Sequence, residues 1–273
     1  MGEHGQPRKP KVIVVMPAYN AAQTLERTYH DIPASVVDRV ILVDDVSADD
    51  TVTISRQLGL RTIVHIQNRG YGGNQKTCYF EALKEGADVV VMLHPDHQYD
   101  ATKIPQLIAP IVDGTADMML GSRLMEDRAL TGGMPIWKYV SNRGLTAIEN
   151  LAFRRQLSEY HTGFRAYSRR MLLTIPFLLN SDAFVFDTQV LAQAVAFGFR
   201  IGEIPVETRY FTEASSVNFR VSLVYGLQTL GTVSEFLLDR SGIRPSMRYR
   251  TTLRRVISQH YHADLFREGE EAL

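Results

Sequence analysis

The chain has 273 residues, is 45% hydrophobic, and carries 30 basic and 30 acidic side chains, so its formal net charge is zero. This length supports one large domain or two closely packed halves, and the balanced charge argues against a nucleic-acid-binding surface spread over the whole chain. With one cysteine, no apolar run of transmembrane length and no signal-peptide core, the sequence predicts a cytoplasmic protein, soluble or peripherally attached to the cytoplasmic face of a membrane.

The first 122 residues alternate short apolar strands with helices. Strands are predicted at Val12–Met16, Val40–Val43, Arg61–Ile66, Asp88–Leu93 and Asp117–Leu120. Helices are predicted over 21–29, from the capping residues at 47–50 to about 58, over 74–85 and over 103–112. The glycines at 70, 72 and 73 predict a flexible turn before the third of these helices. The alternation predicts an α/β fold with a Rossmann-like, mostly parallel sheet flanked by helices.

The pattern beyond residue 122 is less regular. It predicts a loop over 126–135, a helix over 137–154, a turn or strand over 161–168, a helix over 186–197 and a strand over 201–206. Apolar residues then recur at helical spacing, at Phe219, Leu223, Leu227, Leu230, Val233 and Leu237. Five arginines and no acidic residue follow between 244 and 255. This segment predicts either an amphipathic helix with a basic tail on an anionic membrane, or a core or dimer helix with a solvated tail.

Polar groups follow the predicted strands at the point where each strand ends. They are "PAYN" after the first strand, "DD" after the second, "NRGYGG" after the third, "HPDHQ" after the fourth and "GSR" after the fifth. In open α/β sheets, ligands bind at the carboxyl ends of the strands. The sequence therefore predicts one ligand site at that edge of the sheet.

Asp96 and Gln98 are the candidate metal ligands. Both lie in an irregular loop, and carboxylate and amide oxygens suit Mg²⁺ or Mn²⁺. The alternative is a turn capped by the aspartate. His94 and His97 lie nearby, but without a cysteine cluster or HExxH-type spacing a zinc site is disfavoured.

Other charged residues could bind the rest of a nucleotide or phosphate ligand. Asp44 and Asp45 place two carboxylates at a strand end, where a ribose hydroxyl, a base N–H or a cation could balance them. The glycine-rich "NRGYGG" could bring backbone N–H groups to a phosphate, although its spacing is neither a P-loop nor GxGxxG. Arg123, Arg143 and Arg165 together predict an anion-binding site.

These segments, in this order, resemble family 2 glycosyltransferases with the glycosyltransferase A fold. The chain is most similar to the group of polyprenyl-phosphate (dolichol-phosphate) mannose or glucose synthases. The matching segments are "VVMPAYNAAQTL", "VILVDDVSADDT", "NRGYGGNQKTCYFEAL", "ADVVVMLHPDHQYD", "ADMMLGSR", "HTGFRAYSRRML" and "FDTQVLAQAVAFGFRIGEIPVETRY". The resemblance implies a catalytic domain over 11–210, with a nucleotide-sugar half (11–122) and an acceptor half (123–210). Residues 211–273 then form the C-terminal helix and basic tail.

The resemblance also implies roles for individual residues. It assigns nucleotide binding to Pro17, Tyr19, Asn20, Asp44, Asp45, Gly72 and Asp96. It implies that Asp96 and Gln98 bind the Mg²⁺ or Mn²⁺ ion on the diphosphate. It also implies that the acceptor or its phosphate is bound by Arg123, Arg143, Thr162 and Arg165. The implied catalytic residues are Asp96, Arg123, Arg143 and Asp187. Two positions depart from the family pattern, since His94 replaces the first Asp of Asp-x-Asp and Ala21 replaces a Glu.

The implied reaction is inverting transfer of a hexose from a GDP- or UDP-sugar to a polyprenyl phosphate. A phosphate acceptor is already anionic near neutral pH and needs no strong base. An acceptor hydroxyl would need one, for which Asp187 or, less well, His161 is available. Three alternatives remain: a soluble or glycan acceptor, a sugar-1-phosphate nucleotidyltransferase, and an inactive nucleotide-sugar-binding module suggested by His94. The sequence leaves the base, the sugar, the acceptor and any homo-oligomer open.

Overall fold

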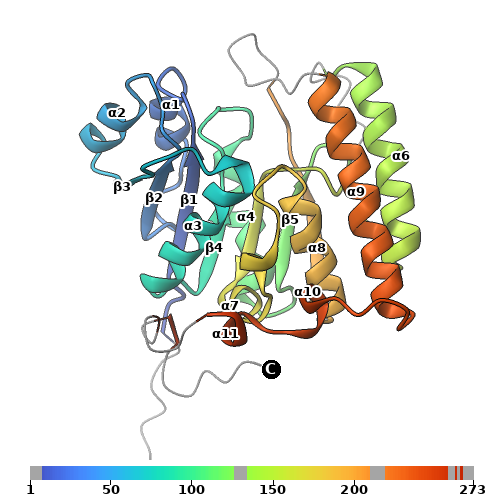
Figure 1. Ribbon diagram of the computed structural model, residues 1–273. Coiled ribbons are helices and arrows are strands. Elements are labelled where there is room, and N and C mark those ends of the chain that lie inside the picture. Colours follow the sequence, from blue (N-terminus) through green and yellow to red (C-terminus); the bar gives the residue numbers. More distant parts are fainter. Residues whose placement is uncertain (1–7, 126–133, 210–218, 258–261, 263–264, 267–273) are drawn as a thin grey trace, which may run out of the picture.

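The computed structural model describes residues 8–125, 134–209, 219–257, 262 and 265–266. A twisted sheet lies at the centre, with helices on both of its faces (Figure 1). Alternate residues of the first strand explain this arrangement. Ile13 and Val15 belong to one buried cluster, and Val12, Val14 and Met16 belong to a second. Because both sets are apolar, each face of the strand requires its own layer of helices.

The sheet has seven strands in the order β3-β2-β1-β4-β6-β5-β7. Their bounds are β1 Val12–Ala18, β2 Arg39–Asp44, β3 Arg61–Val64, β4 Val89–Met92, β5 Met118–Ser122, β6 Arg165–Ser168 and β7 Ile201–Pro205. All neighbours are parallel except β6, which runs antiparallel to both β4 and β5. The predicted α/β class and the mostly parallel sheet are confirmed. Since β6 is inserted between β4 and β5, residues from both predicted halves share one sheet.

The helices mostly follow the predicted positions. Their bounds are α1 Leu25–His30, α2 Thr51–Gln57, α3 Gly70–Lys84, α4 Ile104–Val112, α6 Ile136–Phe153, α7 Arg169–Thr174, α8 Phe186–Ala196, α9 Phe219–Arg240, α10 Met247–Arg250 and α11 Leu253–Val256. Short 3-10 turns lie at Ala101–Lys103 and Phe177–Leu179. The loop predicted over 126–135 lies mostly outside the described residues, as does the side chain of Phe219.

The glycine-rich segment forms the first turn of α3, so the predicted flexible turn is wrong there. A tight approach to the loop before α8 explains the glycines. The Gly72 N–H donates to the Asp182 carbonyl over 2.7 Å, and a Cβ at Gly72 would lie 2.4 Å from the Ser181 carbonyl oxygen. Real Cβ atoms do not approach that closely, so the helix can begin here only with glycine.

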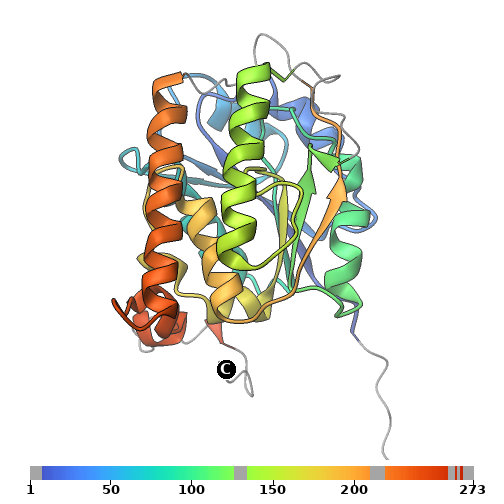
Figure 2. The same cartoon turned by 90° about the vertical axis from the view of Figure 1, so that its right-hand side faces the viewer.

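The C-terminal helices pack against the rest of the described structure. Helices α6 and α9 lie side by side on one flank of the sheet (Figure 2). Beyond them, Tyr249, Leu253 and Leu265 are buried in the main core cluster. The prediction of a free basic tail is wrong for two of its arginines, because Arg248 forms an ion pair with Glu235 and Arg250 with Asp239. These charges are balanced within the protein.

One helix among the described residues is long and apolar enough to cross a membrane, judged by length and composition alone. It is Arg220–Arg240, and 22% of its most apolar window is buried within the protein. The predicted absence of such a run is therefore corrected. One face of this helix packs against the domain through Thr229, Val233 and Phe236.

Candidate functional site

A pocket of about 470 Å³ opens at the carboxyl edge of the sheet. It is lined from three strand ends, by Pro17 at the end of β1 and Tyr19 and Asn20 just after it, by Asp45 after β2, and by His94 and Asp96 after β4. Five of these six residues were predicted to bind the nucleotide or metal. The parallel strands β2, β1 and β4 bring them together, because their carboxyl ends lie at the same edge.

The loops after β1 and β2 are tied to each other by short hydrogen bonds. The Asn20 N–H donates to Ser47 Oγ at 2.8 Å, and the Ala48 N–H donates to Asn20 Oδ1 at 2.8 Å. Asn20 and Val46 both adopt left-handed backbone conformations, with φ of 51° and 68°. Such a conformation is costly for a β-branched residue and is typical of sites where geometry is held for function.

The two adjacent aspartates have different partners. Asp45 accepts the Arg69 and Gly70 N–H groups at 2.8 and 2.9 Å and contacts His65 Nδ1 at 2.7 Å, so it fixes the start of α3 at the pocket. Asp44 is buried, and Oδ2 of its carboxylate accepts the Ser47 N–H at 2.9 Å, whereas its Oδ1 has no partner among the described residues. Asp45, rather than Asp44, lines the pocket.

Gly72, predicted to bind the nucleotide, does not line the pocket. It is buried against the loop at 181–183, as its backbone contacts require. The neighbouring Tyr71 does line the pocket, and its ring lies 4.6 Å from that of Phe184 and stacks on His94 at 5.5 Å. Tyr71, His94 and Phe184 thus form an aromatic wall of the pocket. In the sequence, the tyrosine within the glycine-rich segment was the only indication of it.

Asp187, a predicted catalytic residue, lies behind Tyr71 instead of at the pocket surface. Its carboxylate accepts the Tyr71 hydroxyl at 2.7 Å and Gln75 Nε2 at 3.1 Å. Burial, followed by the Asp187 charge, raises the pKa of the Tyr71 hydroxyl well above its ordinary value. Tyr71 therefore stays protonated and remains a donor. In this arrangement the Asp187 carboxylate fixes the positions of the Tyr71 hydroxyl and the Gln75 amide.

Arg165 was predicted to bind phosphate, and the structure contradicts this role. Its side chain is fully buried and donates to the carbonyls of Thr162, Asp187 and Tyr160 at 2.6, 3.1 and 2.9 Å. Its guanidinium lies 3.7 Å from the Asp187 carboxylate. These internal partners hold the group inside the protein, away from any phosphate in the pocket.

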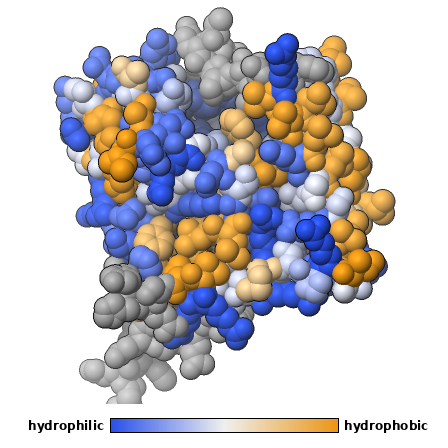
Figure 3. Space-filling model, viewed as in Figure 1, coloured by the Kyte–Doolittle hydropathy of each residue, from blue (hydrophilic) through white to orange (hydrophobic). Residues whose placement is uncertain are grey.

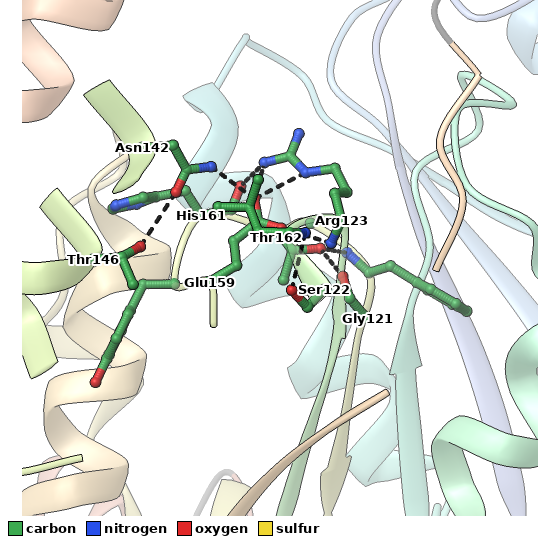
Figure 4. A network of polar contacts seen from close by, with 12 residues as sticks. Gly121, Ser122, Arg123, Asn142, Thr146, Glu159, His161 and Thr162 are labelled. Atoms are coloured by element: carbon green, nitrogen blue, oxygen red, sulfur yellow. Dashed lines mark hydrogen bonds and ion pairs between the residues drawn. The ribbon is translucent and has the colours of Figure 1, made fainter. Parts of the chain in front are cut away.

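Arg123 and Thr162, two predicted acceptor-binding residues, belong to a polar network beside β5 (Figure 4). Arg123 forms an ion pair with the fully buried Glu159 and donates to the His161 carbonyl at 2.7 Å. Although burial opposes it, the Arg123 guanidinium lowers the pKa of Glu159 below its ordinary value. The Thr162 hydroxyl is also buried and donates to the Gly121 carbonyl at 2.6 Å, so its predicted role as a direct ligand is corrected.

Arg143 is exposed on α6, where a phosphate can reach it. A second cation, Lys138, lies five residues earlier on this helix. Its pKa is lowered first by burial and then by the neighbouring charge of Arg123. Lys138 was not predicted from the sequence, because its proximity to Arg123 arises only when α6 packs beside β5.

His161, a weaker candidate base, faces α6 and α9 instead of the pocket. Its Nε2 lies 3.0 Å from the buried Glu149 carboxylate, and its Nδ1 lies 2.7 Å from the Tyr225 hydroxyl. His97 is held by Asp31 and Arg209, at 3.0 and 3.1 Å. Neither histidine lines the pocket.

The candidate metal site is built on Asp96. Its Oδ1 accepts the Gln98 N–H at 3.1 Å, and the side chain lines the pocket, whereas Gln98 does not. Among the described residues there is no group of three His, Cys, Asp or Glu side chains that could enclose a cation. Mg²⁺-type ions in nucleotide enzymes commonly use one or two protein carboxylates and complete their shell with phosphates and water. The residues present fit a cation of that kind.

Several pocket residues were missed by the sequence reasoning. They are Asn68, Tyr71, Asn74, Phe184 and Val221. Val221 belongs to α9, so the helix assigned to the C-terminal segment contributes directly to the pocket. No local pattern indicates this, because the contact depends on how α9 packs.

Comparisons with known proteins agree with this geometry. Residues 13–175, more than half of the chain, match the model of the family described as glycosyl transferase family 2. The UDP-N-acetylglucosamine–dolichyl-phosphate N-acetylglucosaminyltransferase of Methanococcus voltae is 27% identical over 216 residues, covering 73% of this chain and 86% of the relative. The undecaprenyl-phosphate mannosyltransferase of Micrococcus luteus is 25% identical over 203 residues, covering 72% and 82%.

Solved structures show the same fold. Glucosyl-3-phosphoglycerate synthase from Mycobacterium tuberculosis in complex with phosphoglyceric acid matches with a TM-score of 0.65 and 20% identity, over 87% of this chain and 82% of that one. Its complex with Mn²⁺, UDP and phosphoglyceric acid matches with a TM-score of 0.63 and 18% identity, over 87% and 80%. The expected family and fold are confirmed: the chain belongs to glycosyl transferase family 2 and is a glycosyltransferase with the glycosyltransferase A fold.

Proposed function

We propose that the protein is an inverting hexosyltransferase that moves a sugar from a nucleoside diphosphate to a polyprenyl phosphate, with Mg²⁺ or Mn²⁺ as cofactor. The observation that carries this proposal is the pocket at the carboxyl edge of the sheet, where Asp96 and Asp45 converge from different strands. A nucleoside fits against Pro17 and Tyr19, and the diphosphate lies toward Asp96. The two relatives named for lipid-phosphate acceptors support the choice of acceptor.

Uridine is the base that the comparisons favour for the donor. The Methanococcus relative is named for a UDP-sugar, and the Mycobacterium structures contain UDP. GDP and UDP are both open from the sequence, and the side-chain amides of the pocket residues Asn68 and Asn74 donate within the protein, to the carbonyls of Asp45 and Val43.

The chemistry requires positioning and charge stabilisation more than a base. A divalent cation, when bound, stabilises the departing diphosphate as a Lewis acid. The acceptor phosphate is an anionic nucleophile. Arg143 and Lys138 on α6 supply positive charges that can hold it. Asp187, whose oxygens are occupied by Tyr71 and Gln75, is not required to remove a proton.

A soluble phosphate acceptor is the second candidate. The Mycobacterium structures contain phosphoglyceric acid as well as UDP, although their identity of about one fifth relates them to this chain by fold alone. The same cations could hold a small phosphorylated acid. The two candidates differ in whether the enzyme requires a lipid surface.

The outer faces of α6 and α9 favour the lipid acceptor. Exposed apolar side chains recur at helical spacing, three, four, seven or eight residues apart, at Ile136, Val140, Ile148 and Leu151 on α6 and at Leu223, Leu227, Leu230 and Leu237 on α9. Figure 3 shows apolar residues gathered over the flank that these helices cover. We call these eight residues the apolar flank. Lys138 and Arg220 lie in the first turns of α6 and α9, and Arg143 lies further along α6; such cations are expected where helices contact an anionic membrane.

Replacing Leu227 by glutamate is expected to weaken binding to anionic vesicles by about tenfold or more, because a side chain of this size contributes roughly 1.5–3 kcal/mol when it leaves water. Leu227 is 62% exposed, so the change should leave folding intact. The measurement is flotation with phosphatidylglycerol-containing vesicles. Val112→Glu, an exposed apolar residue on α4, is the control and should bind like the wild type. Equal flotation of both variants and the wild type would contradict the membrane role of the apolar flank.

The function itself is tested in two steps. UDP, GDP and dTDP are titrated calorimetrically with Mn²⁺ and again with EDTA, and metal-dependent binding of one diphosphate identifies the donor class. The matching sugar nucleotide is then incubated with a polyprenyl phosphate in detergent or with 3-phosphoglycerate. Transfer to the lipid is the expected result. Transfer to phosphoglycerate alone would select the second candidate, and a lack of nucleotide binding would overturn both.

A further inference from the structure

The imidazole of His94 is held in one orientation by its neighbours. Gly163 packs directly against one edge of the ring, since a Cβ there would lie 2.7 Å from His94 Cδ2 and 2.8 Å from Nε2. Tyr71 stacks on the ring, and its hydroxyl lies 3.2 Å from His94 Nε2. His94 also lines the pocket. With Cδ2 and Nε2 turned to Gly163, the opposite edge, which carries Nδ1, is the one that can face the pocket.

The hydrogen bonds around Tyr71 determine which nitrogen of His94 carries a proton. The single hydroxyl proton of Tyr71 is donated to Asp187, a carboxylate that can only accept and that Arg165 keeps balanced in charge. The Tyr71 oxygen must then act as the acceptor toward His94. Nε2–H of His94 therefore donates to the Tyr71 oxygen, and Nδ1 is the ring nitrogen left to bind a ligand. His94 Nδ1 has no hydrogen-bond partner within the described part of the chain.

We propose that His94 is a metal ligand through Nδ1, and that it binds the divalent cation of the nucleotide-sugar site together with Asp96. The inference rests on the proposed metal-dependent donor site and names a residue that the sequence had suggested only as a departure from the family pattern. His94 and Asp96 are two residues apart and line the same pocket. Donor phosphates and water complete the coordination shell.

Tyr71 and Asp187 have a defined part in this site as positioning residues. Histidine ligands commonly donate their second N–H to an oxygen acceptor, which fixes the tautomer and the ring orientation. The series of hydrogen bonds from His94 to Tyr71 and from Tyr71 to Asp187 has this form. Arg165 forms an ion pair with Asp187 on the interior side. The arrangement explains why the Asp187 carboxylate is kept behind the aromatic wall instead of facing the donor sugar.

An imidazole ligand also changes which metal the site prefers. Mg²⁺ is bound almost entirely by oxygen, whereas nitrogen ligands suit later divalent metals, whose affinity rises from Mn²⁺ through Co²⁺. We therefore expect the protein with UDP to bind Mn²⁺ or Co²⁺ more tightly than Mg²⁺. Replacing His94 by aspartate, which restores an oxygen ligand, should reduce that preference by about tenfold.

The decisive experiment is pulsed electron paramagnetic resonance of Mn²⁺ bound to the full chain with UDP. The expected result is a ¹⁴N coupling from a directly bound imidazole, which is absent in His94→Asn and present in His97→Asn, the matched control from the same loop. Asparagine tolerates the left-handed conformation of His97, whose φ is 57°. In Tyr71→Phe, Mn²⁺ affinity should fall by about 10- to 100-fold while UDP still binds.

Each outcome separates this inference from the proposed function. Metal-dependent UDP binding without a nitrogen coupling would leave the donor site in place and overturn the role of His94. A coupling that persists in His94→Asn would assign the nitrogen to another residue and overturn it as well. If neither UDP nor Mn²⁺ binds the wild-type chain, the metal-dependent donor site and the inference both fail.

Discussion

Asp96→Asn is expected to lower kcat for sugar transfer by about a thousandfold. Among the described residues after β4, Asp96 is the only carboxylate that lines the pocket, and the neutral amide would bind a divalent cation much more weakly. Loss of the Lewis acid leaves the departing diphosphate without its main charge stabilisation, which is worth several kcal/mol. A loss of about 4 kcal/mol corresponds to three orders of magnitude in rate. The measurement is the initial rate of transfer at saturating donor and at an Mn²⁺ concentration that just saturates the wild type.

Two controls make the Asp96 result specific. Asp113→Asn changes an exposed aspartate at the end of α4, away from the pocket, and should retain the wild-type rate. Calorimetry should show that UDP binding to Asp96→Asn no longer responds to EDTA. A variant that keeps both the rate and the metal response would remove Asp96 from the cation site.

Arg165→Met is expected to reduce the free energy of unfolding by about 3–5 kcal/mol, because it removes one partner of a buried ion pair and leaves the Asp187 charge uncompensated. The change also leaves three carbonyl oxygens, of Thr162, Asp187 and Tyr160, without the donors they have in the native protein. Methionine fills much of the volume, so a cavity adds little. Urea denaturation, followed by circular dichroism, measures the difference.

Arg143→Met is the matched control for stability. Arg143 is exposed on α6, and substitutions at such sites usually change stability by less than about 0.5 kcal/mol. This variant should instead raise the KM for the acceptor more than the KM for the donor. If Arg165→Met unfolds at the wild-type urea concentration, the buried pair does not contribute as its geometry implies.

Much of the fold could be predicted from the sequence, because buried parallel strands have a strong local signal. The apolar runs that begin at Val12, Val40 and Val89 are followed by polar loops, and all three are strands in the structure. The strand at 165–168 was left open between turn and strand, since its pairing with β4 and β5 comes from distant parts of the chain. The glycine-rich segment was predicted as a flexible turn and is helical for a related reason. Its glycines are required by close contact with residues 181–183, which are distant in the chain.

The site was predictable in its location and less so in its details. Strand order alone brings Pro17, Asp45 and Asp96 together, and no knowledge of side-chain partners is needed. Whether an arginine faces solvent or the interior depends on packing, and here Arg165 is buried with its own acceptors while Arg143 is exposed. The role of Tyr71 could not be predicted for the same reason, because its contact with Asp187 joins two helices far apart in the chain.

The burial of Leu265 has a consequence for how the protein folds during synthesis. Leu265 is inaccessible to solvent, belongs to the same core cluster as Ile13, and its carbonyl accepts a hydrogen bond from Arg169. The central cluster of the domain therefore cannot close until this late part of the chain has left the ribosome. A nascent chain that already carries all seven strands would still expose apolar surface, and we expect it to depend on chaperones for that interval.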